Sequence, residues 1–161
     1  KWWARQIPVK RGQMHSLSGN LASMANGLPY AIAAQIAYPD RQSVIFIGDG
    51  GFSMLMAEFV TAVKYKLPIK VVIIKNNTLG QIKWEQMVFL GNPEYAVALE
   101  AIDFAAFAQA CGATGFTITD PAECGAILDQ ALKFAQSLVK GQPNRLQIAG
   151  TVFEAKVREL I

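Results

Sequence analysis

Short apolar runs alternate along this chain with stretches in which apolar residues recur at helical spacing. The runs at 43–47 and 70–74 are rich in β-branched residues, which is typical of strands buried on both faces of a parallel sheet. Between them, residues 53–66 place apolar side chains on one helical stripe. This order predicts a strand, a crossover helix and a neighbouring parallel strand.

The rest of the chain continues the same alternation. A helix is predicted over 28–38, with Pro29 in its first turn, whereas 78–100 forms a looser stretch with a turn at Gly91-Asn92-Pro93. Four further elements follow: a helix over 104–111 capped by Asp103, a strand over 116–118, a helix from Asp120-Pro121 to about residue 138, and an amphipathic helix over 151–161 with Phe153, Val157 and Leu160 on one stripe. The alternation predicts a single α/β domain, residues 1–161, built on a doubly wound parallel sheet.

Composition and charge narrow the class of protein. The 161 residues are 52% apolar and 17% charged, which excludes wholesale disorder and allows one domain with its own core. The net charge of +3 is concentrated in 1–11 and 133–161 rather than on one element with interleaved aromatic residues, so we expect no nucleic-acid partner. Cys111 and Cys124 are expected to be reduced, buried thiols of a cytoplasmic protein without a leader or transmembrane segment. The single histidine, His15, excludes metal sites built from several imidazoles.

Polar residues follow the first two predicted strands at the point where each ends. Asp49 comes directly after the first strand, and Asn76 follows the second. Because consecutive parallel strands end at the same edge of a sheet, both side chains are expected to lie there, where their hard oxygen atoms suit Mg²⁺ or Ca²⁺. Gly50 and Gly51 would let a ligand approach the backbone closely. Alternatively, the glycine-rich turn is purely structural and Asp49 caps the following helix.

A phosphate at this edge would depend on a metal and on backbone amides. No Lys or Arg occurs between Arg41 and Lys64, so there is no nearby side-chain cation along the chain. Other phosphate motifs fit poorly, because the chain has no P-loop and no D-x-D nucleophile loop, and Ser53 stands where a dinucleotide fingerprint needs its third glycine.

Together these residues resemble a known motif. Gly48-Asp49-Gly50, followed about 27 residues later by Asn76, is similar to the thiamine diphosphate motif of the pyruvate oxidase and acetolactate synthase superfamily. The resemblance extends upstream over residues 18–32 and covers roughly 13–132. It implies the C-terminal, diphosphate-binding domain of such an enzyme.

The resemblance also implies roles for individual residues. It assigns Mg²⁺ to the side chains of Asp49 and Asn76 and to the backbone carbonyl of Thr78, and the diphosphate to Gly50 and Gly51. Two further residues would hold the organic part of thiamine diphosphate: Ala22 through its backbone carbonyl and Met24 as the apolar prop under the bent cofactor. In relatives, an asparagine often stands at the position of Lys75.

Residues 80–86 are similar to the pyruvate oxidase branch of the superfamily. This similarity places Gln81, Ile82 and Glu85 on the substrate side of the cofactor, where Glu85 would manage protons; the alternative is that Glu85 is a surface carboxylate. The resemblance further implies a 2-keto acid substrate such as pyruvate and a longer flavoprotein oxidoreductase that carries FAD on a domain not present here. It also implies a homodimer or homotetramer in which a pyrimidine-binding domain from a neighbouring subunit supplies a glutamate.

Several alternatives stay open at this point. The domain could belong to an acetolactate synthase-like enzyme or another 2-keto acid decarboxylase, or it could be a non-catalytic assembly or regulatory domain. We expect the chain to be an inactive fragment of a longer enzyme and a segment to be missing near 132–133. The amphipathic helix predicted over 151–161 would pack on a subunit neighbour or, as the less favoured alternative, touch a membrane surface.

Overall fold

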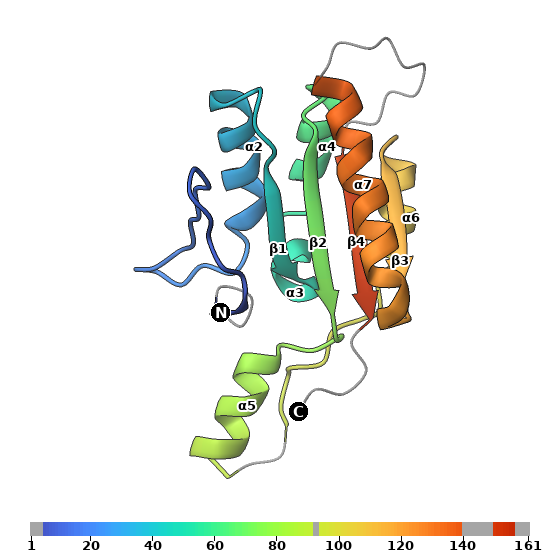
Figure 1. Cartoon of the computed structure of the whole chain (residues 1–161). Coiled ribbons are helices and arrows are strands. Elements are labelled where there is room, and N and C mark those ends of the chain that lie inside the picture. Colours follow the sequence, from blue (N-terminus) through green and yellow to red (C-terminus); the bar gives the residue numbers. More distant parts are fainter. Residues whose placement is uncertain (1–4, 92–93, 140–149, 157–161) are drawn as a thin grey trace.

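A four-stranded parallel sheet forms the centre of the domain (Figure 1). The computed structural model describes residues 5–91, 94–139 and 150–156 of the chain. Within them the strands lie in the order β1-β2-β4-β3, with these bounds: β1 Val44–Gly48, β2 Ile69–Lys75, β3 Thr114–Ile118 and β4 Gly150–Lys156. Each neighbouring pair is parallel, which confirms the predicted fold class.

Helices cover both faces of the sheet, as a doubly wound fold requires. Alternate side chains of β2 point to opposite faces, so that Val71 and Ile73 belong to one core and Val72 to the other. The larger core packs against four helices: α2 Gly27–Ala37, α3 Asp49–Met54, α4 Glu58–Lys64 and α6 Phe104–Ala110. The smaller core packs against α7 Cys124–Val139, which lies in front of the sheet in Figure 1.

Phenylalanine side chains form the centre of the larger core. Phe52 and Phe104 are fully buried and meet edge to face, with ring centroids 5.4 Å apart. Phe59 and Phe107 extend this cluster at centroid distances of 6.4 and 6.3 Å from Phe52. Since Phe52 lies on α3, directly after the end of β1, this packing fixes the helix that carries the glycine-rich turn.

Several predicted elements are confirmed with small changes of boundary. The helix predicted over 28–38 is α2, the strands predicted over 43–47 and 70–74 are β1 and β2, and the strand predicted over 116–118 is β3. β2 is buried on both faces as predicted, whereas β1 is buried on one face only, since Val44 and Phe46 are 42% and 40% exposed. The carboxylate of Asp103 accepts a hydrogen bond from the amide of Ala106 at 2.8 Å and so caps α6 as expected. The Asp120 carboxylate accepts a hydrogen bond from the amide of Ala122 and so caps the short helix η1 Pro121–Glu123. Helix α7 follows and continues through residues 132–133 without a break.

Two predictions about local structure are wrong. The helix predicted over 53–66 is divided into α3 and α4, because the amide of Leu55 bonds to the carbonyl of Phe52 three residues back and the chain turns there. The stretch 78–100, predicted to lack regular structure, contains helix α5 Gly80–Phe89. None of its side chains is buried, so it lacks the one-sided apolar pattern by which helices are found in a sequence.

The prediction of an amphipathic helix over 151–161 is also wrong for those of its residues that the structure describes. Residues 150–156 form β4, which is paired along its length with β2 on one side and β3 on the other. A central strand saturates its backbone hydrogen bonds on both sides, and this outweighs a weak helical stripe. Residues 157–161 lie outside the described part of the chain. Within the part that is described, no helix has the length and apolarity to cross a membrane.

The two cysteines are free thiols, as expected. Both are half-buried rather than fully buried, and burial raises the pKa of the Cys111 thiol. Cys111 packs at the margin of the larger core and Cys124 at the margin of the smaller one. They therefore contribute to opposite faces of the sheet.

Candidate cofactor site

The candidate site lies at the carboxyl ends of β1 and β2. These strands are neighbours, and their register pairs Gly48 with Ile74, so the residues that follow them emerge side by side. Asp49 begins α3, and its side chain is only 5% exposed. The prediction that Asp49 and Asn76 meet at one edge of the sheet is confirmed, since the Asp49 carboxylate lies 3.2 Å from the backbone nitrogen of Asn76.

The Asp49 carboxylate organises the turn that follows β2. Its Oδ2 accepts hydrogen bonds from the amides of Asn76 at 3.2 Å and Asn77 at 2.6 Å, and its Oδ1 accepts one from Gly50 at 3.0 Å. The two turn amides have left the strand ladder, so a buried charged acceptor satisfies them. Two of the three bonds therefore hold the turn, and Asp49 is the first residue of α3 rather than its N-cap, so the alternative of a simple helix cap does not describe its contacts.

The turn itself has a fixed shape. Asn77 adopts the left-handed conformation (φ 54°), which asparagine tolerates better than most residues. The side-chain oxygen of Asn76 accepts a hydrogen bond from the amide of Thr78 at 3.1 Å. The hydroxyl of Thr78 donates to the carbonyl of Val97, also at 3.1 Å. Side-chain and backbone bonds thus fix the conformation of this turn, whose Asn76 and Asn77 amides bind the Asp49 carboxylate. We call residues 76–79 the cofactor turn.

Gly50 and Gly51 line a close approach between three segments. A Cβ atom on Gly51 would lie 2.8 Å from the backbone oxygen of Met24, and one on Gly50 would lie 2.8 Å from Leu79 and 3.0 Å from Leu99. Contacts under 3.0 Å require something to move, and a backbone oxygen moves less readily than a side chain. Gly51 is therefore needed for the close approach of the Met24 backbone, whereas the leucine side chains near Gly50 could adjust. The role of Met24 as a prop under the cofactor stays a prediction.

Ala22 and Met24 lie on the segment before α2. Ala22 is exposed and has a φ of 49°, a conformation that alanine rarely adopts without support from its surroundings. Met24 is 44% exposed, with its Cε methyl group 3.8 Å from the position of a Cβ on Gly50. Both residues are thus open to a ligand.

Gln81, Ile82 and Glu85 are not part of the same cluster. They lie on α5, which extends beyond the carboxyl ends of the strands in Figure 1. All three are exposed, and the side-chain amide of Gln81 donates to Oε1 of Glu85 at 3.1 Å, one helical turn away. The structure therefore brings Gln81 and Glu85 into contact with each other, and no contact described here joins Gln81, Ile82 or Glu85 to Asp49.

The donor set at the site favours a hard cation. Among the residues that the structure describes, no group of three His, Cys, Asp or Glu side chains gathers in one place. A cation here would instead bind the Asp49 carboxylate, the Asn76 side-chain oxygen and a backbone oxygen, a set of ligands typical of Mg²⁺ or Ca²⁺. Among the described residues, Oδ1 of Asp49 and Oδ1 of Asn76 each accept one hydrogen bond, which leaves a lone pair on each for a cation. The residues present therefore fit the metal that the motif implies.

The sequence analysis did not identify Lys75 as a residue that supports the site. Lys75, the last residue of β2, is 7% exposed, and its ammonium group donates a hydrogen bond to the carbonyl of Ile102 and lies 5.8 Å from the centre of the Phe104 ring. These contacts join the end of β2 to the segment before α6. No local pattern in the sequence indicates them, because the partners lie 27 residues apart.

The parallel sheet, the acidic residue after β1 and the amide after β2 together define a cofactor-binding domain of the α/β class. Residues 1–140 match the family described as "Thiamine pyrophosphate enzyme, C-terminal TPP binding domain", and the chain belongs to this family.

Similar proteins agree with this assignment. The chain is 46% identical over 138 residues to YdaP of Bacillus subtilis (strain 168), whose name describes a thiamine pyrophosphate-containing protein; the match covers 86% of this chain and 24% of that protein. It is 36% identical over 117 residues to the acetolactate synthase isozyme 3 large subunit of Escherichia coli (strain K12), and this match covers 72% of this chain and 20% of that protein. The chain thus spans about a quarter or less of the length of these relatives.

The fold resembles that of a solved enzyme. The thiamine diphosphate-dependent 4-hydroxybenzoylformate decarboxylase of Rhodococcus jostii RHA1 superimposes with a TM-score of 0.63 at 24% identity, over 84% of this chain and 23% of that one. At this identity the likeness establishes a shared fold.

Proposed function

We propose that this chain binds thiamine diphosphate through Mg²⁺ and serves as the cofactor domain of a longer enzyme that decarboxylates pyruvate or a related 2-keto acid. The observation that carries the proposal is the buried Asp49 carboxylate, which joins the end of β1 to the cofactor turn beside Gly50 and Gly51. A metal held at this point would lie next to the glycine pair, where a diphosphate needs close access to the backbone.

The ligands of the metal would be Asp49, Asn76 and the backbone carbonyl of Thr78. The fixed turn supports this assignment, because hydrogen bonds already orient the side chains of Asp49 and Asn76 without using all of their lone pairs. Such preorganisation lowers the entropy cost of binding. The metal would neutralise the diphosphate in a region of the sequence, 42–63, that has no Lys or Arg.

The organic part of the cofactor would lie between Met24 and α5. When bound, thiamine diphosphate supplies a nucleophilic carbon and an electron sink for decarboxylation. Met24 would support the cofactor from below, and the backbone carbonyl of Ala22 would accept a hydrogen bond from its aminopyrimidine. On the substrate side, Gln81 and Ile82 would orient the keto acid and Glu85 would hold a proton at its carboxylate, which the amide of Gln81 already orients.

We place the enzyme in the pyruvate oxidase-like branch on the similarity of residues 80–86. The full-length protein would then be a cytoplasmic oxidoreductase with FAD on a separate domain, assembled as a homodimer or homotetramer, and a neighbouring subunit's pyrimidine-binding domain would complete the site. The lengths of the relatives support a larger protein, since this chain spans a quarter of YdaP. An acetolactate synthase-like activity is the second candidate, favoured by 36% identity to a large subunit of that enzyme.

The metal bridge is tested by calorimetry on the full-length protein. Thiamine diphosphate should bind in the presence of Mg²⁺ and lose at least tenfold in affinity in EDTA, an effect of about 1.4 kcal/mol or more. Asp49→Asn should weaken binding similarly, whereas Asp40→Asn, at an exposed aspartate in the turn after α2, should not. Equal affinity with and without the metal would refute the bridge. Failure to bind at all, even in the complete protein, would favour the non-catalytic assembly domain.

The substrate is tested by product analysis. With pyruvate, the full-length enzyme should release CO₂ and reduce FAD in the pyruvate oxidase-like case, or form acetolactate in the alternative case. Residues 1–161 alone should show negligible turnover, because the glutamate from the neighbouring subunit would be absent. Clear turnover by the isolated chain would contradict that dependence.

A further inference from the structure

Helix α5 is held in place without a buried side chain. It has ten residues, none of which is buried, and its apolar side chains Ile82, Trp84, Met87, Val88 and Phe89 are 41–72% exposed. A helix of this length is marginal by itself in water. In Figure 1 it extends away from the layers of the sheet, so packing on the core does not fix its direction. Some other contact must do so.

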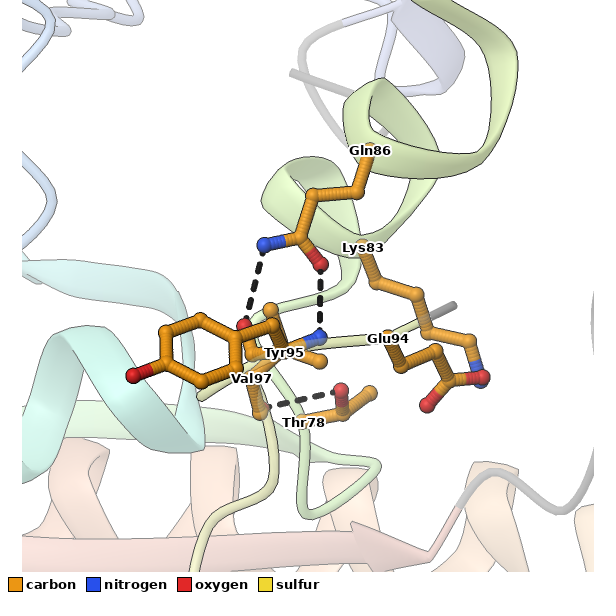
Figure 2. Close-up of polar contacts among 6 residues, drawn as sticks. All are labelled: Thr78, Lys83, Gln86, Glu94, Tyr95 and Val97. Carbon is orange, nitrogen blue, oxygen red and sulfur yellow. Dashed lines mark hydrogen bonds and ion pairs between the residues drawn. The ribbon is translucent and has the colours of Figure 1, made fainter. Parts of the chain in front are cut away.

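Figure 2 shows that contact as a two-fold hydrogen bond between Gln86 and Tyr95. The side-chain oxygen of Gln86 accepts from the Tyr95 amide at 3.1 Å, and the side-chain nitrogen donates to the Tyr95 carbonyl at 2.9 Å. Both backbone groups of one residue are thus satisfied by one side chain. Only a group with a donor and an acceptor side by side, such as a primary amide, does this.

An ion pair supports the same side of the helix. Lys83, one turn before Gln86, lies 2.6 Å from Glu94 through Nζ and Oε1. The two side chains are 34% and 50% exposed, and pairs so open to solvent contribute little. The Gln86–Tyr95 bond pair is therefore the stronger determinant of where α5 lies.

The segment bonded to Gln86 leads directly back to the cofactor turn. The Val97 carbonyl accepts from the Leu79 amide at 2.8 Å and from the Thr78 hydroxyl at 3.1 Å. The Leu99 amide donates to the Asn77 carbonyl at 2.9 Å, and the Asn77 amide in turn binds Asp49. Hydrogen bonds therefore tie the segment 95–99 to α5 at one end and to the cofactor turn at the other.

The two faces of α5 have different contacts. At 100° per residue, Lys83 and Gln86 lie on one side of the helix, and Gln81 and Glu85 lie on the opposite side. The first pair bonds to Glu94 and Tyr95, whereas the second pair bonds only to each other among the contacts described here. The bond pair thus holds the back of a helix whose front carries two predicted substrate-side residues.

We propose that Gln86 is a positioning residue, which fixes α5 so that Gln81 and Glu85 keep a defined place relative to the cofactor turn. This inference rests on the proposed function in one respect, namely that Gln81 and Glu85 face the substrate. Gln86 itself touches neither the cofactor nor the substrate. Its contribution is to set the direction of α5 through the Tyr95 backbone.

The test measures amide hydrogen exchange and kinetics in the full-length protein. Gln86→Leu removes both bonds, and exchange in α5 and at the amides of Tyr95 and Leu79 should rise about 10- to 30-fold, since each hydrogen bond contributes a factor of about five. Exchange at the buried strand β2 should not change. The kcat should fall while the affinity for thiamine diphosphate stays within about twofold, because Asp49 and the glycine pair are untouched. The matched control is Gln109→Leu, at an exposed glutamine on α6.

A second variant separates positioning from a general loss of stability. Gln86→Glu keeps the geometry but, when ionised, presents only acceptors and faces the Tyr95 carbonyl with a negative charge. When protonated, the introduced carboxyl again offers one donor and one acceptor. Protection of α5 relative to the wild type at the same pH should therefore be low at pH 7 and recover as the pH falls to the ordinary glutamate pKa of about 4.3, which no simple loss of packing predicts.

The outcomes are decisive. Unchanged exchange over 80–90 in Gln86→Leu, or an equal increase in Gln109→Leu, would overturn the proposal whatever the enzymatic rate. Increased exchange with an unchanged kcat would also overturn it, because α5 would then move without affecting catalysis. If the wild type binds no thiamine diphosphate, the proposed function fails, and the exchange data still decide whether Gln86 holds α5.

Discussion

Substitution of Gly51 by alanine tests whether the close approach at the cofactor site is a requirement of the backbone. The new Cβ atom would lie 2.8 Å from the Met24 oxygen and 3.1 Å from Ile47 Cγ1. Ile47 is buried in the larger core and cannot move away freely, so the segment carrying Met24 has to shift. Overpacking of this kind costs about 1–3 kcal/mol.

An opposing effect has to be subtracted. Gly51 lies within α3, where alanine is favoured over glycine by up to about 1 kcal/mol. Gly125 provides the matched control, because it also lies in a helix, α7, and a Cβ atom there meets nothing within 4 Å. Gly125→Ala should therefore stabilise the protein, and Gly51→Ala should be less stable than that control by about 1–3 kcal/mol.

The assay is urea unfolding of both variants, combined with calorimetric titration of thiamine diphosphate in Mg²⁺. Because the displaced segment carries Met24 and Ala22, the affinity of the Gly51→Ala variant should fall about tenfold or more, equivalent to about 1.4 kcal/mol. Gly125→Ala should bind like the wild type. If Gly51→Ala proves as stable as Gly125→Ala and binds the cofactor normally, the reasoning from close approach is refuted.

Two further predictions concern regions away from the site. Burial lowers the pKa of Lys70 to about 8 from its ordinary 10.5. Between these pH values the unfolded chain binds more protons than the folded protein, so the free energy of unfolding should rise with pH. Lys70→Met should flatten that rise in urea unfolding, and an equally steep rise in the variant would contradict the assignment. Asp103→Ala removes the cap of α6 and should cost about 1 kcal/mol in thermal unfolding, whereas Asp103→Asn, which can still accept from the Ala106 amide, should cost less; equal losses would count against the capping bond.

The parts of the fold that follow local rules could be predicted from the sequence. β1 and β2 are recognisable as runs of apolar, β-branched residues, and β2 is buried on both faces as such a run predicts. β1 has one exposed face, with Val44 and Phe46, which the same pattern does not reveal. The meeting of Asp49 and Asn76 follows from topology, since consecutive parallel strands end at one edge. Asp103 before α6 is a local signal for a helix start.

The parts that depend on distant partners could not be predicted. The backbone of β4 is saturated by β2 and β3, which no pattern within residues 150–156 reveals. α5 lacks a buried face, so its helical state has no periodic signature. The bond pair of Gln86 depends on the backbone of Tyr95, and any exposed glutamine looks the same in a sequence. Such contacts are decided by tertiary structure.

The central place of β4 has a consequence for how this domain comes into being on the ribosome. β4 is the latest of the four strands in sequence, yet it separates β2 from β3 and pairs with both. A nascent chain that ends before residue 150 therefore has no partner for the inner edges of β2 and β3, and open strand edges invite pairing with other chains. Because parallel pairing over long sequence separations is slow, the sheet can be completed only after residue 156 has been released. Until then the inner edges of β2 and β3 stay unpaired, and open edges of this kind make a partly folded chain prone to aggregation.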